Sequence, residues 1–158
     1  MNRRNALCLA TVCVIGAALL PANAIAQQAD ADGVKAASQA YYAALAVSDN
    51  GAAMEKVWAH TPYITYIGPR SKSIIVGWEP LKKMWEELNS ITAERNVAVL
   101  DPHIHVNGNL AWEMAQETGS AKFKDGKEVK IDSLVTNVYE KLDGRWLIVS
   151  HHVQPKPQ

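Results

Sequence analysis

Apolar positions recur with a helical spacing in the first half of this chain and with a strand spacing in the second half. The helical spacing predicts helices from Val34 to Val47, through Met54 to Trp58, and after Gly77. Apolar runs rich in β-branched and aromatic residues predict strands at 63–67, 73–76, 92–100, 103–106, 110–122, 129–141 and 145–153. Helices followed by a long antiparallel meander indicate an α+β fold, with three N-terminal helices packed on a strongly curved, mostly antiparallel sheet.

The last two predicted strands flank Asp143-Gly144, a strong signal for a tight hairpin turn. The turn predicts a register that pairs Lys141 with Trp146, Tyr139 with Ile148, Asn137 with Ser150 and Val135 with His152. One face of the hairpin then carries Val135, Asn137, Tyr139, Trp146, Ile148, Ser150 and His152. This face mixes large apolar side chains with a few hydrogen-bonding ones, which is typical of the wall of a small-molecule pocket. The opposite face is also mostly apolar, so we expect the sheet to be covered on both sides.

The first 26 residues have the pattern of a secretory signal peptide. Arg3 and Arg4 precede an apolar stretch, and the small residues at Ala24 and Ala26 offer a cleavage site. An uncleaved anchor helix is the alternative, but the apolar run is short for a bilayer span and Pro21 interrupts it. We therefore expect cleavage after Ala26, a disordered lead at 27–33 and a single domain at 34–154. The mature protein is expected to be periplasmic or secreted, without a membrane segment.

Composition narrows the possible stabilising and binding modes of the mature chain. Both cysteines, Cys8 and Cys13, lie in the predicted signal peptide, so stability must come from a packed core and not from a disulfide. Removing Arg3 and Arg4 lowers the basic count from 16 to 14 against 16 acidic residues, which gives a net charge of −2. No basic patch or arginine-rich arm is present in the sequence, so nucleic acid is not expected as a partner.

Four residue runs give the chain a resemblance to a known family. They are Gly77-Trp78-Glu79, Asp101-Pro102-His103-Ile104-His105-Val106 with Gly108, Val135-Thr136-Asn137-Val138-Tyr139, and Asp143-Gly144-Arg145-Trp146 with His152. The chain resembles the NTF2-like superfamily, which includes ketosteroid isomerase and the SnoaL-like polyketide cyclases. Within it, the closest likeness is to the association domain of calcium/calmodulin-dependent protein kinase II.

The resemblance implies a cone, in which three helices close a bent sheet around a cavity, and a homodimer formed through the outer face of the sheet. The apolar side chains Leu147, Val149 and Val153 beside Val138 agree with such a dimer. The chain also departs from the association domain, which has an arginine of its anion-binding pocket where this chain has Asn137.

Polar side chains on the predicted pocket face are the first functional candidates. Histidine ordinarily titrates near neutrality, so His152 is a candidate ligand contact and catalytic acid or base; alternatively, it bonds structurally to a backbone carbonyl. Asn137 offers a donor and an acceptor and suits a polar anchor in an apolar pocket, unless a neighbouring loop satisfies it. Tyr139 shares this face and is also a candidate ligand contact.

Aromatic and acidic residues supply the other candidates. We expect Trp85 and Tyr66 to form cavity walls, because the apolar stripe of the third helix and the first strand should face each other; core packing is the alternative role. Glu113 and Glu117 share one face of a strand, and a carboxylate buried inside the cone could act as a general base. Glu113 is therefore a further catalytic candidate, with a solvated strand face as the alternative.

Metal and nucleophile chemistry have weaker support in the sequence. His103 and His105 alternate along a strand and project to one side, so they could chelate zinc or copper if a third ligand approached. The pair could equally form hydrogen bonds at a sheet edge or a subunit interface, and neither a metal nor a cofactor is expected. The sequence contains no nucleophile elbow and no phosphate-binding glycine loop, so hydrolysis through a covalent intermediate is not expected.

Three functions are left open by the sequence. The first is an exported homodimeric protein that binds a small, largely apolar or aromatic molecule. The second is a cofactor-independent isomerase, cyclase or dehydratase that uses His152 or Glu113 for proton transfer. The third is an oligomerisation module with an incidental pocket. Binding is favoured over catalysis, because the sequence offers His152 without a clear second polar group to complete a proton transfer.

Overall fold

The computed structural model describes residues 22–47 and 51–157. Its helices are α1 (Ala22–Ala46), α2 (Gly51–Val57) and α3 (Trp78–Ile91). Its strands are β1 (Thr65–Ile67), β2 (Ile75–Val76), β3 (Thr92–Asn107), β4 (Leu110–Phe123), β5 (Glu128–Leu142) and β6 (Arg145–Pro155). The two strands predicted at 92–100 and 103–106 are one strand with an irregular register between Leu100 and His103. Most of the predicted signal peptide, residues 1–21, lies outside the described residues.

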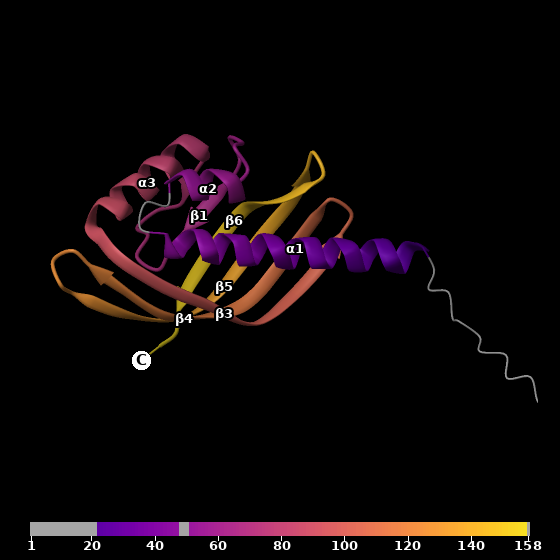
Figure 1. The fold of residues 1–158 in the computed structure, drawn as a ribbon. Coiled ribbons are helices and arrows are strands. Elements are labelled where there is room, and N and C mark those ends of the chain that lie inside the picture. The colour runs from indigo at the N-terminus through magenta and orange to yellow at the C-terminus, as the bar shows by residue number, and fades with distance from the viewer. Residues whose placement is uncertain (1–21, 48–50, 158) are drawn as a thin grey trace, which may run out of the picture.

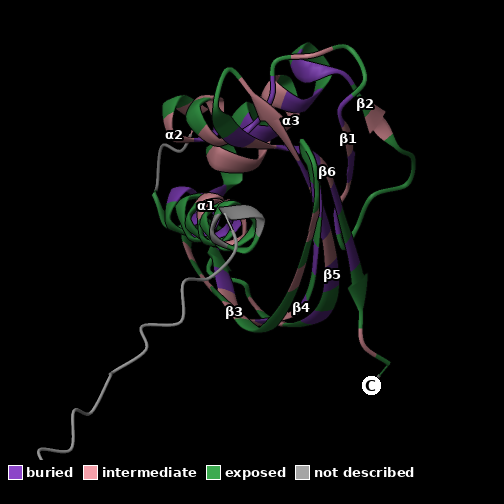
Figure 2. Ribbon diagram, turned by 90° about the vertical axis from the view of Figure 1, so that its right-hand side faces the viewer, coloured by how far each residue is buried: buried purple, intermediate pink, exposed green. Residues whose placement is uncertain are grey.

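In the described part of the chain, the strands form a single sheet in the order β2-β1-β6-β5-β4-β3. β1 runs parallel to β6, and the other neighbouring pairs are antiparallel. The long strands β3 to β6 curve around α1, while α2 and α3 lie over one end of the sheet (Figure 1, Figure 2). This arrangement is the α+β cone that the sequence predicts.

The interior is formed by the inward-facing side chains of the strands, at every second position, and by the apolar face of α3. α3 buries Trp78, Leu81 and Trp85 on one face. On β4, buried and more exposed positions alternate, and the buried set contains Glu113 and Glu117 together with Ala111, Ala115 and Ala121. Side chains from α1 reach both glutamates, so the first helix closes the inner face of the sheet over two carboxylates.

β3 and β4 approach each other closely at Gly119, two residues beyond Glu117. The backbone of Gly119 has a φ of 144°, and a Cβ atom there would lie 1.8 Å from the carbonyl oxygen of Asn96. Only glycine fits this contact, because any side chain would overlap the neighbouring backbone. The glycine thus permits the pairing of β3 with β4 beside Glu117.

Residues 27–33 were expected to form a disordered lead, and this prediction is wrong: they continue α1 as helix. The segment is tied to the domain, because the carboxylate of Asp30 accepts from Lys141 Nζ at 2.5 Å. Gly33 packs directly on the indole of Trp146, at a distance where a Cβ atom would lie 2.8 Å from the ring. Small polar residues at a chain end resemble a disordered segment, but these contacts stabilise the helix.

The predicted hairpin register is correct near the turn and wrong beyond it. Lys141 pairs with Trp146 and Tyr139 with Ile148, as expected, but Val138 then pairs with Ser150, so Val149 is an extra residue on β6. Such a β-bulge moves every later side chain to the opposite face of the sheet. The pairs beyond it are Asn137 with His151, Thr136 with His152 and Val135 with Val153. His151, and not His152, therefore lies on the inner face.

Candidate functional site

A cavity of about 590 Å³ lies between α1, α3 and the inner face of the sheet. This volume falls within the range of about 300–1,000 Å³ that small-molecule sites occupy. Much of its wall is apolar, with Leu45, Trp85, Leu88, Val97, Ala121, Phe123, Val129, Ile131 and Val153. Its polar side chains include Tyr41, Tyr66, Arg95, Glu117 and His151. The composition suits a flat, largely apolar molecule with a small number of polar groups.

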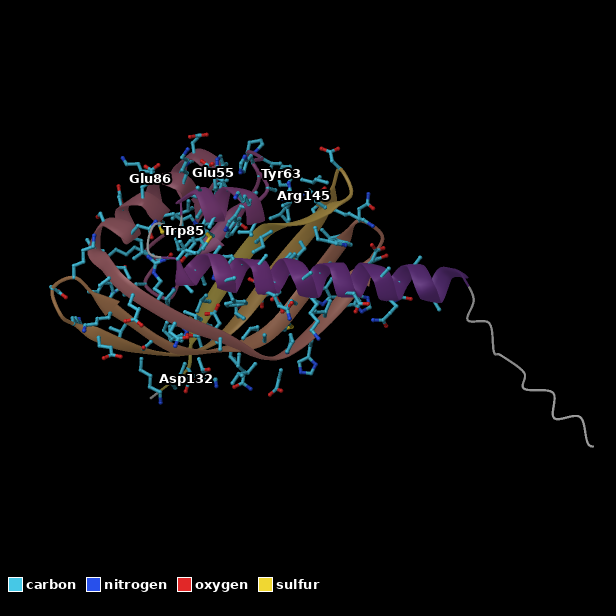
Figure 3. All side chains as sticks on the ribbon, viewed as in Figure 1. Glu55, Tyr63, Trp85, Glu86, Asp132 and Arg145 are labelled. Carbon is cyan, nitrogen blue, oxygen red and sulfur yellow. The ribbon has the colours of Figure 1, made fainter. Side chains whose placement is uncertain are left out.

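The two predicted aromatic walls do lie on this cavity. Tyr66 from β1 and Trp85 from α3 are buried, with ring centroids 5.6 Å apart in an edge-to-face arrangement. Trp85 points into the interior beneath α3, whereas its exposed neighbour Glu86 points outward (Figure 3). Their contact with a ligand stays a prediction, but their position is the one that the sequence indicates.

His152 does not lie on this cavity, so its predicted position is wrong. It is exposed on the outer face of the sheet, beside His103 and Met114 in a separate groove of about 300 Å³. The bulge at Val149 is the cause, because it exchanges the faces of two adjacent histidines. His151 takes the inner position, where its ring is buried and stacks on Tyr66 at 5.3 Å between centroids.

Glu113, Asn137 and Tyr139 lie beneath the cavity wall and form a buried polar cluster. The carboxylate of Glu113 accepts three hydrogen bonds: from Ser38 Oγ at 2.9 Å, from Tyr139 OH at 2.7 Å and from Asn137 Nδ2 at 2.9 Å. Asn137 and Tyr139 are fully buried and are not among the residues that line the cavity, which corrects their predicted place on its wall. Because its partners are protein groups, Glu113 stabilises the packing of α1 on the sheet.

The cluster fixes the protonation of His151. A carboxylate can only accept, so Asn137 turns its amide towards Glu113 and its carbonyl oxygen towards His151. His151 Nδ1 must then carry the hydrogen that it donates to Asn137 over 2.7 Å, which leaves a lone pair on Nε2. The hydroxyl of Tyr41 lies 3.4 Å from that nitrogen. Burial, and secondly the charge of His152, lowers the pKa of His151 to about 3, so the ring is neutral near pH 7.

Glu117 is the carboxyl group that reaches the cavity. It is buried, and the one hydrogen bond found to it among the described side chains comes from Tyr42 OH at 2.9 Å. Burial raises the pKa of Glu117 to about 7; the bond from Tyr42 lowers it, and the charge of Glu113 raises it. The group therefore exchanges its proton near neutrality, as a general acid and base must.

Arg95 is a cationic side chain on the wall of the same cavity, four positions along the strands from Glu117. Its Nη2 donates to Asn89 Oδ1 at 3.0 Å, and its guanidinium carbon lies 5.8 Å from the centre of the Trp85 ring. Neither Arg95 nor His151 was predicted as a site residue. Two adjacent histidines on a strand indicate that one of them faces inward in any register, but no sequence pattern indicates that an arginine near the start of a strand would reach the interior.

The described residues contain no cluster of side chains suited to binding a metal ion. Among these residues, no group of three or more His, Cys, Asp or Glu side chains could hold a metal ion. His105 instead packs against Trp112, with 4.3 Å between the ring centroids. No helix of the described residues is both long and apolar enough to cross a membrane.

Comparison with protein families shows which family this chain belongs to. A family model described as the SnoaL-like domain matches residues 34–154. The chain belongs to the SnoaL-like domain family. No curated protein matches it.

Solved structures of NTF2-like proteins share the fold of this SnoaL-like domain. A candidate dehydratase of the NTF2-like family from Streptomyces avermitilis is 18% identical, covers 84% of this chain and 99% of its own, and has a TM-score of 0.73. A candidate kinase II association domain from Xanthomonas campestris is 21% identical, with coverages of 96% and 99% and a TM-score of 0.64. A candidate scytalone dehydratase from Novosphingobium aromaticivorans is 10% identical, with coverages of 85% and 89% and a TM-score of 0.75. The predicted resemblance is confirmed at the level of the fold.

Proposed function

We propose that this SnoaL-like domain is a cofactor-independent proton-transfer enzyme, of the isomerase, cyclase or dehydratase type, for a small, largely apolar or aromatic molecule. The observation that carries the proposal is that Glu117 and His151 reach the same apolar cavity. The sequence favoured binding alone because His152 had no clear second polar group. In the structure His152 lies outside the cavity, but two other polar groups, Glu117 and His151, line it together, and this supports catalysis. The dehydratase names of two similar structures agree with this class.

Glu117 is the group that moves the proton. Its carboxylate takes a proton from an activated carbon of the substrate, so the C–H bond breaks and the carboxyl O–H bond forms. The electron pair shifts into the substrate, and the carboxyl returns the proton to a second carbon, which regenerates the carboxylate and completes an isomerisation. The raised pKa of Glu117 leaves both of its forms populated near pH 7. The bond from Tyr42 holds the group in place without fully stabilising its charge.

His151 and Tyr41 orient the substrate in this proposal. The lone pair on His151 Nε2 accepts a hydrogen bond from a substrate hydroxyl, because its low pKa keeps the ring neutral. The Tyr41 hydroxyl is 3.4 Å from that nitrogen, a long contact that a substrate oxygen can replace. Tyr66 and Trp85 pack edge to face and together supply an aromatic wall against which a flat molecule can lie.

Hydrogen–deuterium exchange tests the proposal. The protein is incubated in D₂O with small flat ketones such as 2-tetralone, and proton loss at the carbon next to the carbonyl is followed by NMR. We expect exchange faster than in buffer alone, lost in Glu117→Gln and kept in Glu94→Gln, an exposed carboxylate on β3. Exchange that survives Glu117→Gln would contradict the role of Glu117. Ligand binding without any exchange would favour the simple binding protein.

We further propose that the domain forms a homodimer through the outer face of its sheet. The predicted patch was partly wrong, since Val149 and Val153 are buried. Exposed apolar side chains lie elsewhere on the long strands: Leu100, Trp112, Met114 and Leu134. Met114→Glu should convert a dimer to a monomer in light scattering, while Lys122→Glu, exposed on the same strand, should not. A monomeric wild-type protein would overturn the proposal.

Export is proposed on the sequence pattern of residues 1–26. Cleavage after Ala26 would shorten α1 to begin at Gln27 and leave its contacts through Asp30 and Gly33 intact. Intact-mass measurement of the protein purified from its host should give a mature chain that starts at Gln27. A full-length mass in the cytoplasmic fraction would contradict export.

A further inference from the structure

Two nitrogen donors of the cavity wall have no hydrogen-bond partner. They are Nη1 of Arg95 and Nε1 of Trp85, both buried among the described atoms. Both residues line the cavity, and the guanidinium lies beside the indole ring. Buried donors without an acceptor cost free energy, so such a pair is suited to a ligand that supplies acceptor oxygens.

The charge of Arg95 is also uncompensated within the described residues. Its other terminal nitrogen bonds to the neutral amide of Asn89, and no carboxylate forms an ion pair with it. Two more cations, Arg70 and Lys130, line the same cavity, while Asp132 is taken by Lys156 at 2.8 Å. Glu117 is partly neutral near pH 7 because its pKa is raised. The cavity therefore carries an excess of positive charge behind apolar walls.

We propose that Arg95 and Trp85 bind a carboxylate of the ligand, so that the substrate is an aromatic or conjugated carboxylic acid. Arg95 Nη1 and Trp85 Nε1 would each donate to one carboxylate oxygen. A neutral carbonyl would satisfy the donors but leave the guanidinium charge without a counter-ion. This inference rests on the proposed function, in that it takes the cavity as the substrate site. It differs from the pocket of the kinase association domain, since the cation comes from β3 and Asn137 holds no charge.

The arrangement also orients the substrate. Arg95 pairs with Ala121 and Glu117 with Val99, so the two charged residues lie four positions apart along the same pair of strands, and Tyr66 lines the cavity with both. A ligand that runs along Tyr66 with its carboxylate at Arg95 brings its other end towards Glu117. The anchoring group and the reacting carbon are thus held at opposite ends of the molecule.

Calorimetry with matched ligands tests the inference. The probes are the aromatic carboxylates 2-naphthoate and 1-naphthoate, each against its neutral amide. We expect at least one carboxylate to bind the wild-type protein about tenfold or more tightly than its amide, the effect of a charge-assisted hydrogen bond. Arg95→Gln should abolish this preference, because it should weaken carboxylate binding far more than amide binding. Arg145→Gln, at an exposed site away from the cavity, should keep it.

Arg70→Gln separates a specific site from diffuse charge. Arg70 lines the cavity too and lies over the Phe123 ring at 5.0 Å, but its loss should weaken carboxylate binding less than the loss of Arg95. Equal losses in both variants would overturn the specific site. Absence of any carboxylate preference, or of any binding, would overturn it as well. Carboxylate binding through Arg95 without proton exchange would leave this inference standing and contradict only the proposed catalysis.

Discussion

Two regions of the inner sheet face hold a carboxylate four residues apart on β4, and they differ in how the charge is satisfied. Around Glu113, three side-chain donors from α1 and β5 meet the two carboxylate oxygens. Around Glu117, Tyr42 supplies one bond, and the rest of the group faces an apolar cavity. Both residues are buried to a similar extent, so burial does not separate them. The number of donors does, because it decides how many acceptor positions of the carboxylate are already occupied by the protein.

The difference separates a structural carboxylate from a reactive one. A fully satisfied buried cluster makes the packing of α1 on β4 and β5 specific, but it has no capacity left for a substrate. A poorly satisfied carboxyl group at a cavity keeps its proton to a higher pH and can exchange it with a ligand. Substitutions at the two carboxylates should therefore change stability in opposite directions.

Removing the carboxylate of the satisfied cluster should have the largest effect on stability. Glu113→Ala leaves Ser38, Asn137 and Tyr139 as buried donors without their acceptor. We expect the free energy of unfolding to fall by about 3–5 kcal/mol, as for other broken buried networks. Urea denaturation followed by tryptophan fluorescence measures it. A loss below about 1 kcal/mol would mean that the cluster does not hold α1 on the sheet.

Glu117→Gln should instead stabilise the protein, and increasingly so at higher pH. The pKa of Glu117 is about 7 in the folded state against 4.5 for the ordinary group, so the folded state binds more protons between these values. The contribution of this group to stability therefore falls as the pH rises from 4.5 to 7, by about 3 kcal/mol in all.

Unfolding of Glu117→Gln and the wild-type protein from pH 4.5 to 8 measures the difference, since other titrating groups are common to both. The exposed Glu94→Gln variant should stay within about 0.5 kcal/mol of the wild type throughout. A pH-independent gap for Glu117→Gln would contradict the raised pKa of Glu117.

The two adjacent histidines test the bulge that places one of them in the site. His151→Ala removes a buried ring that bonds to Asn137 and stacks on Tyr66, so we expect a loss of about 2 kcal/mol. His152→Ala removes an exposed ring and should cost less than about 0.5 kcal/mol. Thermal and urea unfolding of the pair measure both losses. The reverse order would show that the register without a bulge is the correct one.

Tyr42→Phe should have the smallest effect of these variants, and it should act on the pKa of Glu117. The variant removes the hydrogen bond that favours the ionised form of Glu117, so the pKa of Glu117 should rise further, by about one unit. The midpoint of the pH profile of 2-tetralone exchange should move upward accordingly. Tyr63→Phe removes a similar but exposed bond, to Glu140 at 2.6 Å, and should leave the profile unchanged. A shift in both variants would mean that the effect is not local to Glu117.

Local sequence patterns were sufficient to predict the helices and strands and part of the candidate site. Apolar spacing located the helices and strands, and the stripe on α3 with the first strand indicated Tyr66 and Trp85, which lie side by side on the cavity wall. The pairing of Glu113 and Glu117 on one face also followed from alternation along β4. The different hydrogen bonding of Glu113 and Glu117 could not be predicted from the sequence, because the donors Ser38 and Tyr42 come from α1, some 75 residues away in the chain.

The sequence by itself determined the α+β class and the order of its elements, because periodicity and turn residues act over a few neighbours and all favour the same elements. The closed cone was implied by the family resemblance. The tertiary structure alone decided which histidine faces inward. Val149, Ser150, His151 and His152 fit a strand in either register, and the extra residue of a bulge leaves no mark in the pattern. It also decided that Arg95 reaches the cavity and that Glu117 has a single side-chain donor within the described part of the chain. Such properties depend on contacts between distant segments, and those contacts exist only once the sheet has curved around α1.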